Sequence, residues 1–269
     1  MKIALVQLNG GPAIADNLEP AAALIRAAAA GGARLIATPE NTCRMAKDND
    51  ARWAESFEEA DHPALPFYAA LARELGVWLL IGSLSSIRVG DRLANRSYLF
   101  APDGALKEFY DKIHLFDVDL DNGESYRESD LIRAGGRVVV SDIDGIKTGL
   151  SICYDLRFPH LYRELAHRGA QMLAIPAAFT VPTGKAHWET LLRARAIENG
   201  AYVLAPAQGG LHASGRATYG HSMVIDPWGH VIAHKDDDAA GILYADIDAA
   251  ETAKARAAIP SLRHDRPIV

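Results

Sequence analysis

The sequence predicts an α/β protein with a mixed sheet, or a pair of sheets, covered by helices. Two observations carry this prediction. Apolar runs typical of buried strands alternate with stretches of helical spacing, which favours parallel strands joined by helical crossovers. Short turn sequences at 101–104 and 227–229 separate other strand-like runs, and tight hairpins require antiparallel pairs.

The first elements lead to a glutamate. Residues 2–8 are a short apolar run that predicts a strand buried on both faces. Asp16 and Glu19 have the spacing of a capping box, so a helix should follow them. The next strand, 35–37, runs towards Glu40. Sites in α/β sheets usually lie at the carboxyl ends of strands, which makes Glu40 a candidate, although a surface glutamate is the ordinary alternative.

A lysine follows the next group of elements. The pattern predicts a helix at 63–76, a strand at 77–82 and a hairpin at 92–110. Lys112 comes directly afterwards, among apolar and aromatic residues. Burial there would lower its pKa unless nearby carboxylates keep it charged, and a lysine lying along the surface is the ordinary alternative. Residues 119–130 are polar and predict a loop long enough to fold over a site.

Cys153 lies where a buried strand gives way to a helix. Residues 138–151 predict a strand, a turn and a second strand, and residues 159–166 have helical spacing. A sharp turn between them can expose a thiol and aim backbone N–H groups at an incoming oxygen. A free cysteine is also commonly a buried packing residue.

The remaining elements complete one domain, 1–269. No repeat, low-complexity linker or change of composition divides the chain. Arg195 falls on the apolar side of a predicted helix, so it needs a carboxylate partner. The elements predicted after Cys153 are strands at 170–176, 201–206, 222–226, 230–233 and 241–247, and helices from 185 to about 198 and at 249–258.

Charge and composition exclude several classes of function. The net charge of −6, without a run of Lys and Arg, argues against nucleic-acid binding. No apolar run is long enough to cross a membrane, and the first residues resemble a strand rather than a signal peptide. Two cysteines, Cys43 and Cys153, give neither a disulfide framework nor zinc-ligand spacing. We therefore expect a cytoplasmic protein.

Three segments together resemble the nitrilase superfamily of carbon–nitrogen hydrolases. They are Thr-Pro-Glu-Asn at 38–41, Tyr-Asp-Lys-Ile-His-Leu-Phe at 110–116, and the run 149–159 around the cysteine. The likeness covers essentially the whole chain. Residues 182–199 and 219–229 look like the Nit branch, and the segment from Ala207 to Gly220 is more similar to deaminated glutathione amidases than to ω-amidases.

The resemblance implies a fold and a set of catalytic residues. The fold is an αββα sandwich, two mixed sheets flanked by helices, and it pairs into a homodimer or higher homo-oligomer. Cys153 would be the nucleophile, Glu40 the general base and Lys112 the cation beside the developing oxyanion. Glu128 would be the supporting glutamate, with Glu124 as the competing candidate. No metal or organic cofactor is expected.

The resemblance also implies a substrate pocket. Arg157, Phe179 and Thr183 match positions that line it, and the backbone N–H of Tyr154 should help to stabilise the oxyanion. Arg157 follows the nucleophile by four residues, about one helical turn, and can bind a carboxylate through two hydrogen bonds.

The expected partner is a small-molecule amide that carries a carboxylate. Hydrolysis through a thioester would convert deaminated glutathione into 2-oxoglutarate and Cys-Gly. The alternatives are a 2-oxoglutaramate amidase (ω-amidase), an N-carbamoyl-amide hydrolase or a nitrilase. A papain-like cysteine–histidine pair using His114, His187 or His221 is a further alternative, as is a binding module without activity. The role of Cys43 near the pocket stays open.

Overall fold

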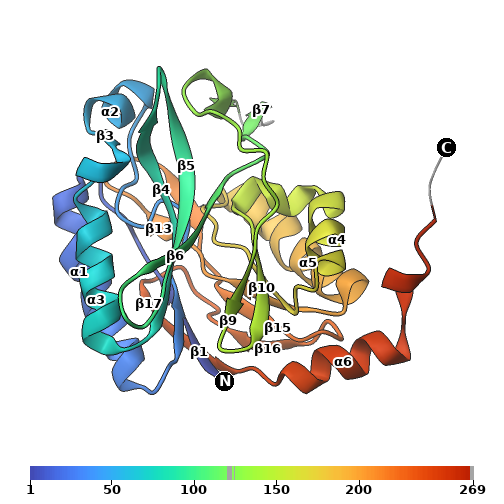
Figure 1. Ribbon diagram of the computed structural model, residues 1–269. Helices are drawn as coiled ribbons and strands as arrows, with labels where there is room; N and C mark the ends of the chain where they lie inside the picture. The colour runs from blue at the N-terminus through green and yellow to red at the C-terminus, as the bar shows by residue number, and fades with distance from the viewer. Residues whose placement is uncertain (120–122, 124, 267–269) are drawn as a thin grey trace.

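The computed structural model describes residues 1–119, 123 and 125–266. Two mixed sheets lie face to face, and helices cover the outer face of each, as Figure 1 shows. This is the αββα sandwich that the family resemblance implies. The helices are α1 (Ile14–Ala30) and α3 (Ala64–Leu75) on the first sheet, and α4 (Pro159–His167) and α5 (Val181–Asn199) on the second.

The first sheet has a parallel centre and antiparallel edges. β1, β2 and β4 run parallel, whereas β17, β5 and β6 join them by antiparallel pairing. β3 (Phe57–Glu58) pairs with the far end of β4. The order across the sheet is β17 (Gly241–Asp246), β1 (Lys2–Gln7), β2 (Leu35–Ala37), β4 (Trp78–Val89), β5 (Arg92–Phe100) and β6 (Leu106–Asp111).

The second sheet repeats this plan. β10, β11 and β12 are parallel, and β9, β15 and β16 add antiparallel pairs. Both predicted hairpin turns, at 101–104 and 227–229, join antiparallel strands. The order is β16 (Val231–His234), β15 (Met223–Ile225), β12 (Tyr202–Ala205), β11 (Met172–Ala174), β10 (Ile146–Leu150) and β9 (Val140–Ile143).

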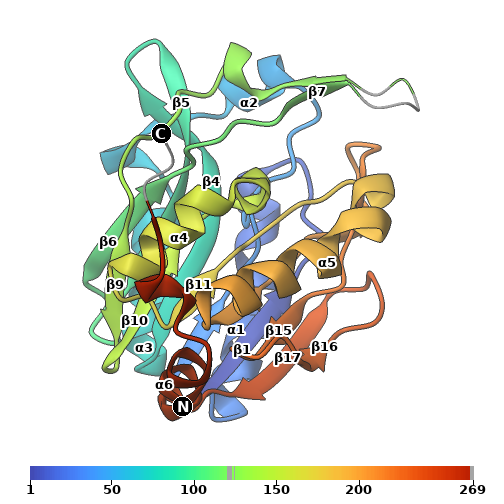
Figure 2. The ribbon, with the colours of Figure 1, turned by 90° about the vertical axis from the view of Figure 1, so that its right-hand side faces the viewer.

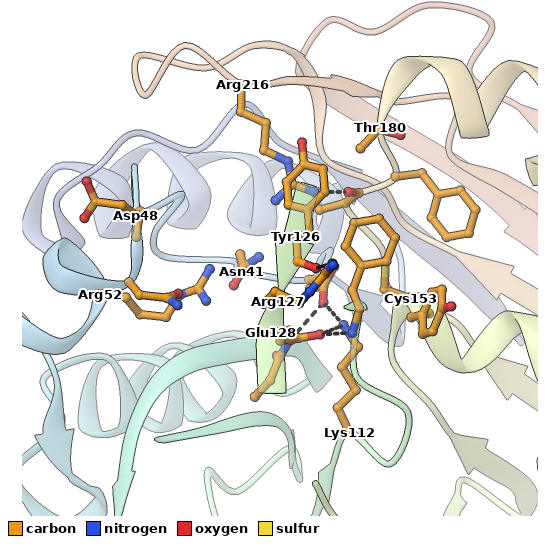
Figure 3. A pocket seen from close by; sticks show the side chains of 18 of the residues that line it. Asn41, Asp48, Arg52, Lys112, Tyr126, Arg127, Glu128, Cys153, Thr180 and Arg216 are labelled. Carbon is orange, nitrogen blue, oxygen red and sulfur yellow. Dashed lines mark hydrogen bonds and ion pairs between the residues drawn. The ribbon is translucent and has the colours of Figure 1, made fainter. Parts of the chain in front are cut away.

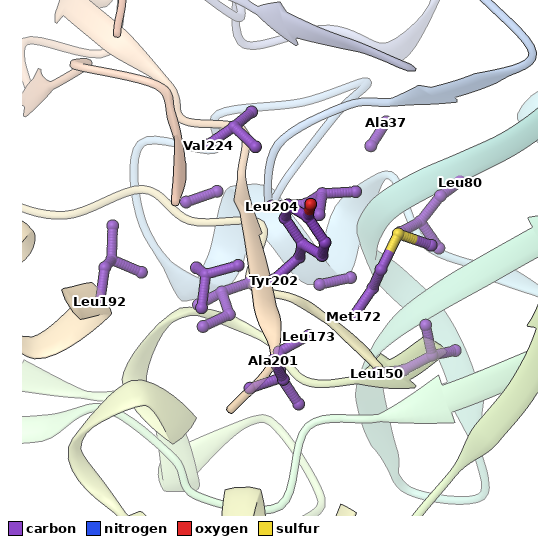
Figure 4. Close-up of a cluster of buried hydrophobic side chains, with 14 of the residues drawn as sticks. Ala37, Leu80, Leu150, Met172, Leu173, Leu192, Ala201, Tyr202, Leu204 and Val224 are labelled. Carbon is purple, nitrogen blue, oxygen red and sulfur yellow. The ribbon is translucent and has the colours of Figure 1, made fainter. Parts of the chain in front are cut away.

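The alternation of side chains along the strands creates two hydrophobic cores. Successive side chains of a strand point to opposite faces, so Ile3 and Leu5 belong to one core while Ala4 and Val6 belong to the other, beneath α1 and α3. In Figure 4, Leu80 of the first sheet lies beside buried side chains of the second. Continuous apolar runs are needed because both faces of each central strand are covered.

Some helix starts differ from the sequence prediction. The capping box is wrong, because α1 begins at Ile14, before Asp16, and no side chain caps it. The Asn17 side chain instead bonds both polar backbone groups of Gly11. α5 begins at Val181, earlier than predicted, because Pro182 fits the first turn of a helix, where no backbone donor is needed.

Short elements gather around one end of the sandwich. The predicted loop at 119–130 is in part a hairpin, since Ser125 and Arg127 both bond the Asp119 carboxylate across it. Figure 2 shows β7 at the same end of the molecule as α2. These elements are α2 (Asn49–Ala54), the pair β7 (Asp117–Asp119) and β8 (Ser125–Arg127), the pair β13 (Gly209–Leu211) and β14 (Ala217–Tyr219), and 3₁₀ turns at Glu59–Asp61, Glu128–Asp130 and Cys153–Arg157.

The chain closes with α6 (Ala249–Ala258), capped by the Asp248 side chain, and a 3₁₀ turn at Ser261–Arg263. Its bounds agree with the predicted helix at 249–258. Across the described residues, no helix has both the length and the apolar character needed to cross a membrane.

Gly82 of β4 packs closely against the backbone before Glu40 and against Pro176, which follows β11. A Cβ there would lie 2.1 Å from the Thr38 carbonyl oxygen and 2.5 Å from Cβ of Pro176. We therefore expect Gly82→Ala to lower the free energy of unfolding by about 1–3 kcal/mol, the usual cost of overpacking. Urea unfolding measures this. Gly136→Ala is the matched control, because its Cβ would meet no atom within 4 Å, and equal stability of the two variants would contradict the prediction.

Candidate active site

The predicted site residues converge on one cavity of about 390 Å³, within the range of small-molecule sites. Glu40 follows β2, Lys112 follows β6, Cys153 follows β10, and Glu128 begins the 3₁₀ turn after β8. Figure 3 shows Lys112, Glu128 and Cys153 around its floor. All eight predicted residues line it, Tyr154, Arg157, Phe179 and Thr183 included. Glu124, the competing glutamate, lies outside the described residues.

Lys112 is buried between two carboxylates. Its Nζ lies 2.9 Å from Oε1 of Glu40 and 2.9 Å from Oε2 of Glu128, and the residue is 2% exposed. Burial by itself lowers the pKa of Lys112, but the charges of Glu128 and Glu40 outweigh it and hold the pKa above the ordinary lysine value. The lysine is therefore a fixed cation rather than a base.

Asn95 joins the two carboxylates, and sequence reasoning missed it. Its Nδ2 donates to Oε1 of Glu40 and to Oε1 of Glu128, both at 2.9 Å, and Glu128 also accepts from the backbone N–H of Phe116 at 2.7 Å. Burial raises the pKa of Glu128, but Lys112 and these donors outweigh it, so the pKa is lowered. The available signal was an asparagine inside a strand, where this residue type is uncommon.

A second amide fixes the backbone that carries Glu40. Nε2 of Gln208 donates to the carbonyl oxygens of Glu40 and Asn41 at 3.0 and 3.1 Å. Asn41 itself has a φ of 57°, in the left-handed region, and its N–H donates to Oγ of Ser83. The chain therefore turns sharply after Glu40 and is held there by Ser83 of β4 and by Gln208, which follows β12. Sequence reasoning used Gln208 only as part of a family-like segment.

Cys153 occupies a strained turn. Its φ is 49°, uncommon for a residue with a side chain, and its N–H donates to the Pro176 carbonyl at 2.9 Å. This N–H is therefore not free to serve as an oxyanion donor, and Tyr154 carries the next N–H along the chain. Arg195 also holds this turn, because its Nε donates to the Leu156 carbonyl, and it has the predicted carboxylate partner in Glu198 at 2.9 Å.

The thiol of Cys153 keeps its proton in the free protein. Burial and the neighbouring charge of Glu40 raise its pKa well above the ordinary value, more than Lys112 and the N–H of Ala178 lower it. Glu40 lies close enough to the thiol to raise its pKa, so a carboxylate able to accept the proton is beside it.

Asp155 connects the cysteine turn with the Lys112 segment, and sequence reasoning missed this too. The fully buried carboxylate accepts from the Ile152 N–H, the Tyr110 hydroxyl and the His114 N–H, at 2.7–2.9 Å. An acidic residue beside Cys153 in an apolar run was the available signal.

The histidines have other contacts. Nδ1 of His114 pairs with Asp155 at 2.7 Å and its ring stacks on Phe158, while Nδ1 of His187 lies 3.3 Å from Arg157. His221 stacks on a tyrosine and pairs with another histidine. None of the three lies in the described wall of the cavity, so the geometry does not support a papain-like pair.

Arg157 lines the cavity, whereas Cys43 is buried in a hydrophobic core. The guanidinium of Arg157 lines the cavity, 5.7 Å from the ring centre of Tyr154 and 5.4 Å from that of Phe179. Cys43 is buried in the core beneath α1 and α3, and burial raises the pKa of its thiol to about 12. Cys43 is therefore a packing residue.

Comparison with known proteins agrees with this geometry. The carbon-nitrogen hydrolase model matches residues 2–257. A deaminated glutathione amidase of Yersinia enterocolitica is 41% identical over 268 residues, covering 98% of this chain and 92% of that protein. The omega-amidase NIT2 of Mus musculus is 36% identical over 98% of this chain and 95% of its own.

A solved structure is similar over the same length. Nit3 of Saccharomyces cerevisiae, a member of branch 10 of the nitrilase superfamily, has a TM-score of 0.86 and 31% identity, covering 97% of this chain and 94% of its own. The family match spans nearly the whole chain and includes every residue of the cavity floor described above. The chain therefore belongs to the carbon-nitrogen hydrolase family.

Proposed function

We propose that this protein is a cysteine-dependent amidase that cleaves deaminated glutathione into 2-oxoglutarate and Cys-Gly. The observation that carries the proposal is the buried Lys112 between Glu40 and Glu128, in the same cavity as the thiol of Cys153. The Yersinia relative supports the choice of substrate. Hydrolysis of 2-oxoglutaramate is the second candidate, supported by the likeness to an omega-amidase.

The first half-reaction forms a thioester. The Cys153 thiol passes its proton to Glu40 while Sγ attacks the amide carbonyl carbon. The carbonyl oxygen becomes an oxyanion, which Lys112 and the Tyr154 N–H stabilise by roughly 3–4 kcal/mol for each well-placed donor. Glu40 then gives the proton to the amide nitrogen, the C–N bond breaks, and Cys-Gly leaves as an amine.

The second half-reaction releases the acid. Glu40 takes a proton from water while the water oxygen attacks the thioester carbon. The second oxyanion forms in the same place as the first and uses the same donors. When it collapses, the C–S bond breaks and the sulfur recovers its proton from Glu40. Asn95 and Glu128 hold Glu40 and Lys112 in position through both steps.

The domain organisation, the cellular compartment and the oligomeric state are inferred as follows from the family match and the cysteines. We infer that residues 1–269 act as one domain, because the family match runs through both sheets. We also infer a cytoplasmic homodimer or higher homo-oligomer. The two free, buried cysteines are consistent with a reducing compartment, and the family resemblance supports the oligomer.

Cys153→Ala should abolish turnover, whereas Cys43→Ala should leave most of it, because only Cys153 lines the cavity. Iodoacetamide labelling followed by peptide mass analysis measures which thiol reacts. The raised pKa of Cys153 predicts a labelling rate that still rises above about pH 9, later than for an ordinary thiol with a pKa near 8.5. Appreciable turnover by Cys153→Ala protein would refute the mechanism.

Glu40→Gln keeps the shape of the side chain but removes the base, and Lys112→Met removes the cation. Each should lower kcat at least about a hundredfold, the scale of one lost oxyanion donor or general base. Initial rates measure this, with circular dichroism to verify folding. Glu58→Gln, an exposed change on β3, is the control. Near-normal rates in a folded variant would remove that residue from the mechanism.

Arg157→Ala should raise KM steeply for substrates with a 2-oxo acid, because a charge-assisted pair with its carboxylate is lost. A neutral amide such as pentanamide should lose much less. Steady-state kinetics on deaminated glutathione, 2-oxoglutaramate and pentanamide measure the difference. Equal losses on acid and neutral substrates would remove Arg157 from substrate binding, and a wild-type preference for 2-oxoglutaramate would favour the omega-amidase candidate.

A further inference from the structure

Two arginines that line the cavity, Arg52 and Arg216, have no part in the reaction scheme and no carboxylate partner among the described residues. Arg52 belongs to α2, and Arg216 lies directly before β14. Figure 3 shows both side chains extending from the wall towards the middle of the cavity, with Asn41 between them and Tyr126 beside Arg216. Both come from the short elements at one end of the sandwich rather than from its two large sheets.

These arginines have unused hydrogen-bonding capacity. Nε of Arg52, Nε of Arg216 and Oδ1 of Asn41 are buried and have no hydrogen-bond partner within the described part of the chain. A buried donor without a partner is costly, so such groups commonly mark a place where a ligand binds. Arg216 is held in position by Nη2, which donates to the Ala178 carbonyl at 2.9 Å, and by packing on the ring of Tyr126.

The charges around them favour an anion. Burial lowers the pKa of Arg52, and the positive charges of Arg216 and Arg44 lower it further, against the opposite effect of Glu128 and Glu40. Several other charges near them already have a partner. Glu40 and Glu128 bind Lys112, Arg44 pairs with Glu55, Arg127 pairs with Asp119, and Asp48 caps the N–H of Ala51.

We propose that Arg52 and Arg216 form a second anion-binding subsite, which holds the carboxylate of the leaving dipeptide. The proposal rests on the proposed function, because it takes deaminated glutathione as the substrate. That molecule carries one carboxylate on the 2-oxo acid, assigned above to Arg157, and another at the glycine end. An extended dipeptide spans at most about 7 Å, so its carboxylate binds close to the scissile amide.

This subsite selects between the two candidate substrates. 2-Oxoglutaramate ends at its amide nitrogen and has no group that reaches the two arginines. Deaminated glutathione gains binding energy there, remote from the bond that breaks, and that energy can be used to orient the amide for attack. Arg52 and Arg216 are therefore specificity-determining residues, while Arg157 serves both substrates.

Arg52→Met and Arg216→Met test the subsite on three substrates. These are deaminated glutathione, its C-terminal carboxamide and 2-oxoglutaramate. We expect kcat/KM for deaminated glutathione to fall at least about tenfold, as for one lost hydrogen bond to a charged group. The carboxamide should be a poorer substrate of the wild type and insensitive to either change. Activity on 2-oxoglutaramate should be unchanged, which also verifies folding.

Arg168→Met is the matched control, because Arg168 is an exposed arginine at the end of α4, paired with Glu164 away from the cavity wall. It should leave all three activities unchanged. Arg52→Met is the decisive variant, because Arg216 also contacts Ala178, whose N–H faces the thiol. If Arg52→Met loses the same factor on all three substrates, or loses nothing on deaminated glutathione, the subsite is wrong. A wild-type enzyme that cannot cleave deaminated glutathione would instead refute the proposed function, and the subsite with it.

Discussion

One buried ammonium group between two carboxylates organises this site. Nζ of Lys112 lies 2.9 Å from a carboxylate oxygen of Glu40 and 2.9 Å from one of Glu128. Asn95, on β5, donates a hydrogen bond to each of the same two carboxylates. Burying such charges is costly, and removing one partner of a buried pair typically costs about 3–5 kcal/mol. Their close geometry is therefore tightly specified. It places Glu40 against Lys112 on one side and beside the thiol of Cys153 on the other.

The charge of this cluster explains why the cysteine rests as a neutral thiol. Two carboxylates against one ammonium leave a net negative charge beside the sulfur, and burial adds to its effect, so the pKa of Cys153 is raised. A thiolate would be unfavourable there before substrate binds. In the proposed reaction the proton moves to Glu40 only as the negative charge passes to the carbonyl oxygen, next to Lys112. The site is thus suited to the transition state rather than to a free thiolate.

The two-sheet fold brings these groups together. Glu40 and Lys112 follow strands of the first sheet, and Cys153 follows a strand of the second. The cysteine turn is tied across the sandwich by Asp155, which bonds Tyr110 of β6. Gly82 lets the backbone before Glu40 approach the second sheet closely. Small errors in sheet packing would therefore appear directly as errors in the catalytic distances.

Much of this arrangement could be predicted from the sequence, because it depends on local pattern. Apolar runs and turn residues located the strands, and Glu40, Lys112 and Cys153 each lie within three residues of the end of one. The mixed sheets followed from hairpins and crossovers occurring in one chain. The family resemblance then supplied the sandwich, and the structure places Glu128 against Lys112.

The rest depends on contacts between distant residues, which local pattern does not contain. Asn95 meets Glu40 across 55 positions of sequence, and Gln208 meets it across 168. The start of α1 was missed because Asn17 bonds to the preceding loop, whereas the Asp16 pattern only resembled a cap. The β7–β8 hairpin was missed because cross-strand bonds to Asp119 stabilise a polar segment without an apolar alternation.

The most direct measurement of the central claim is the mass of the enzyme trapped during turnover. Protein mixed with deaminated glutathione is quenched in acid within the steady state, digested and analysed by mass spectrometry. The mechanism predicts a 2-oxoglutaryl group, removable by hydroxylamine, on the peptide that contains Cys153, and its absence from Glu40→Gln protein. An acyl group on Cys43 would contradict the mechanism, and so would one that forms at the normal rate without Glu40.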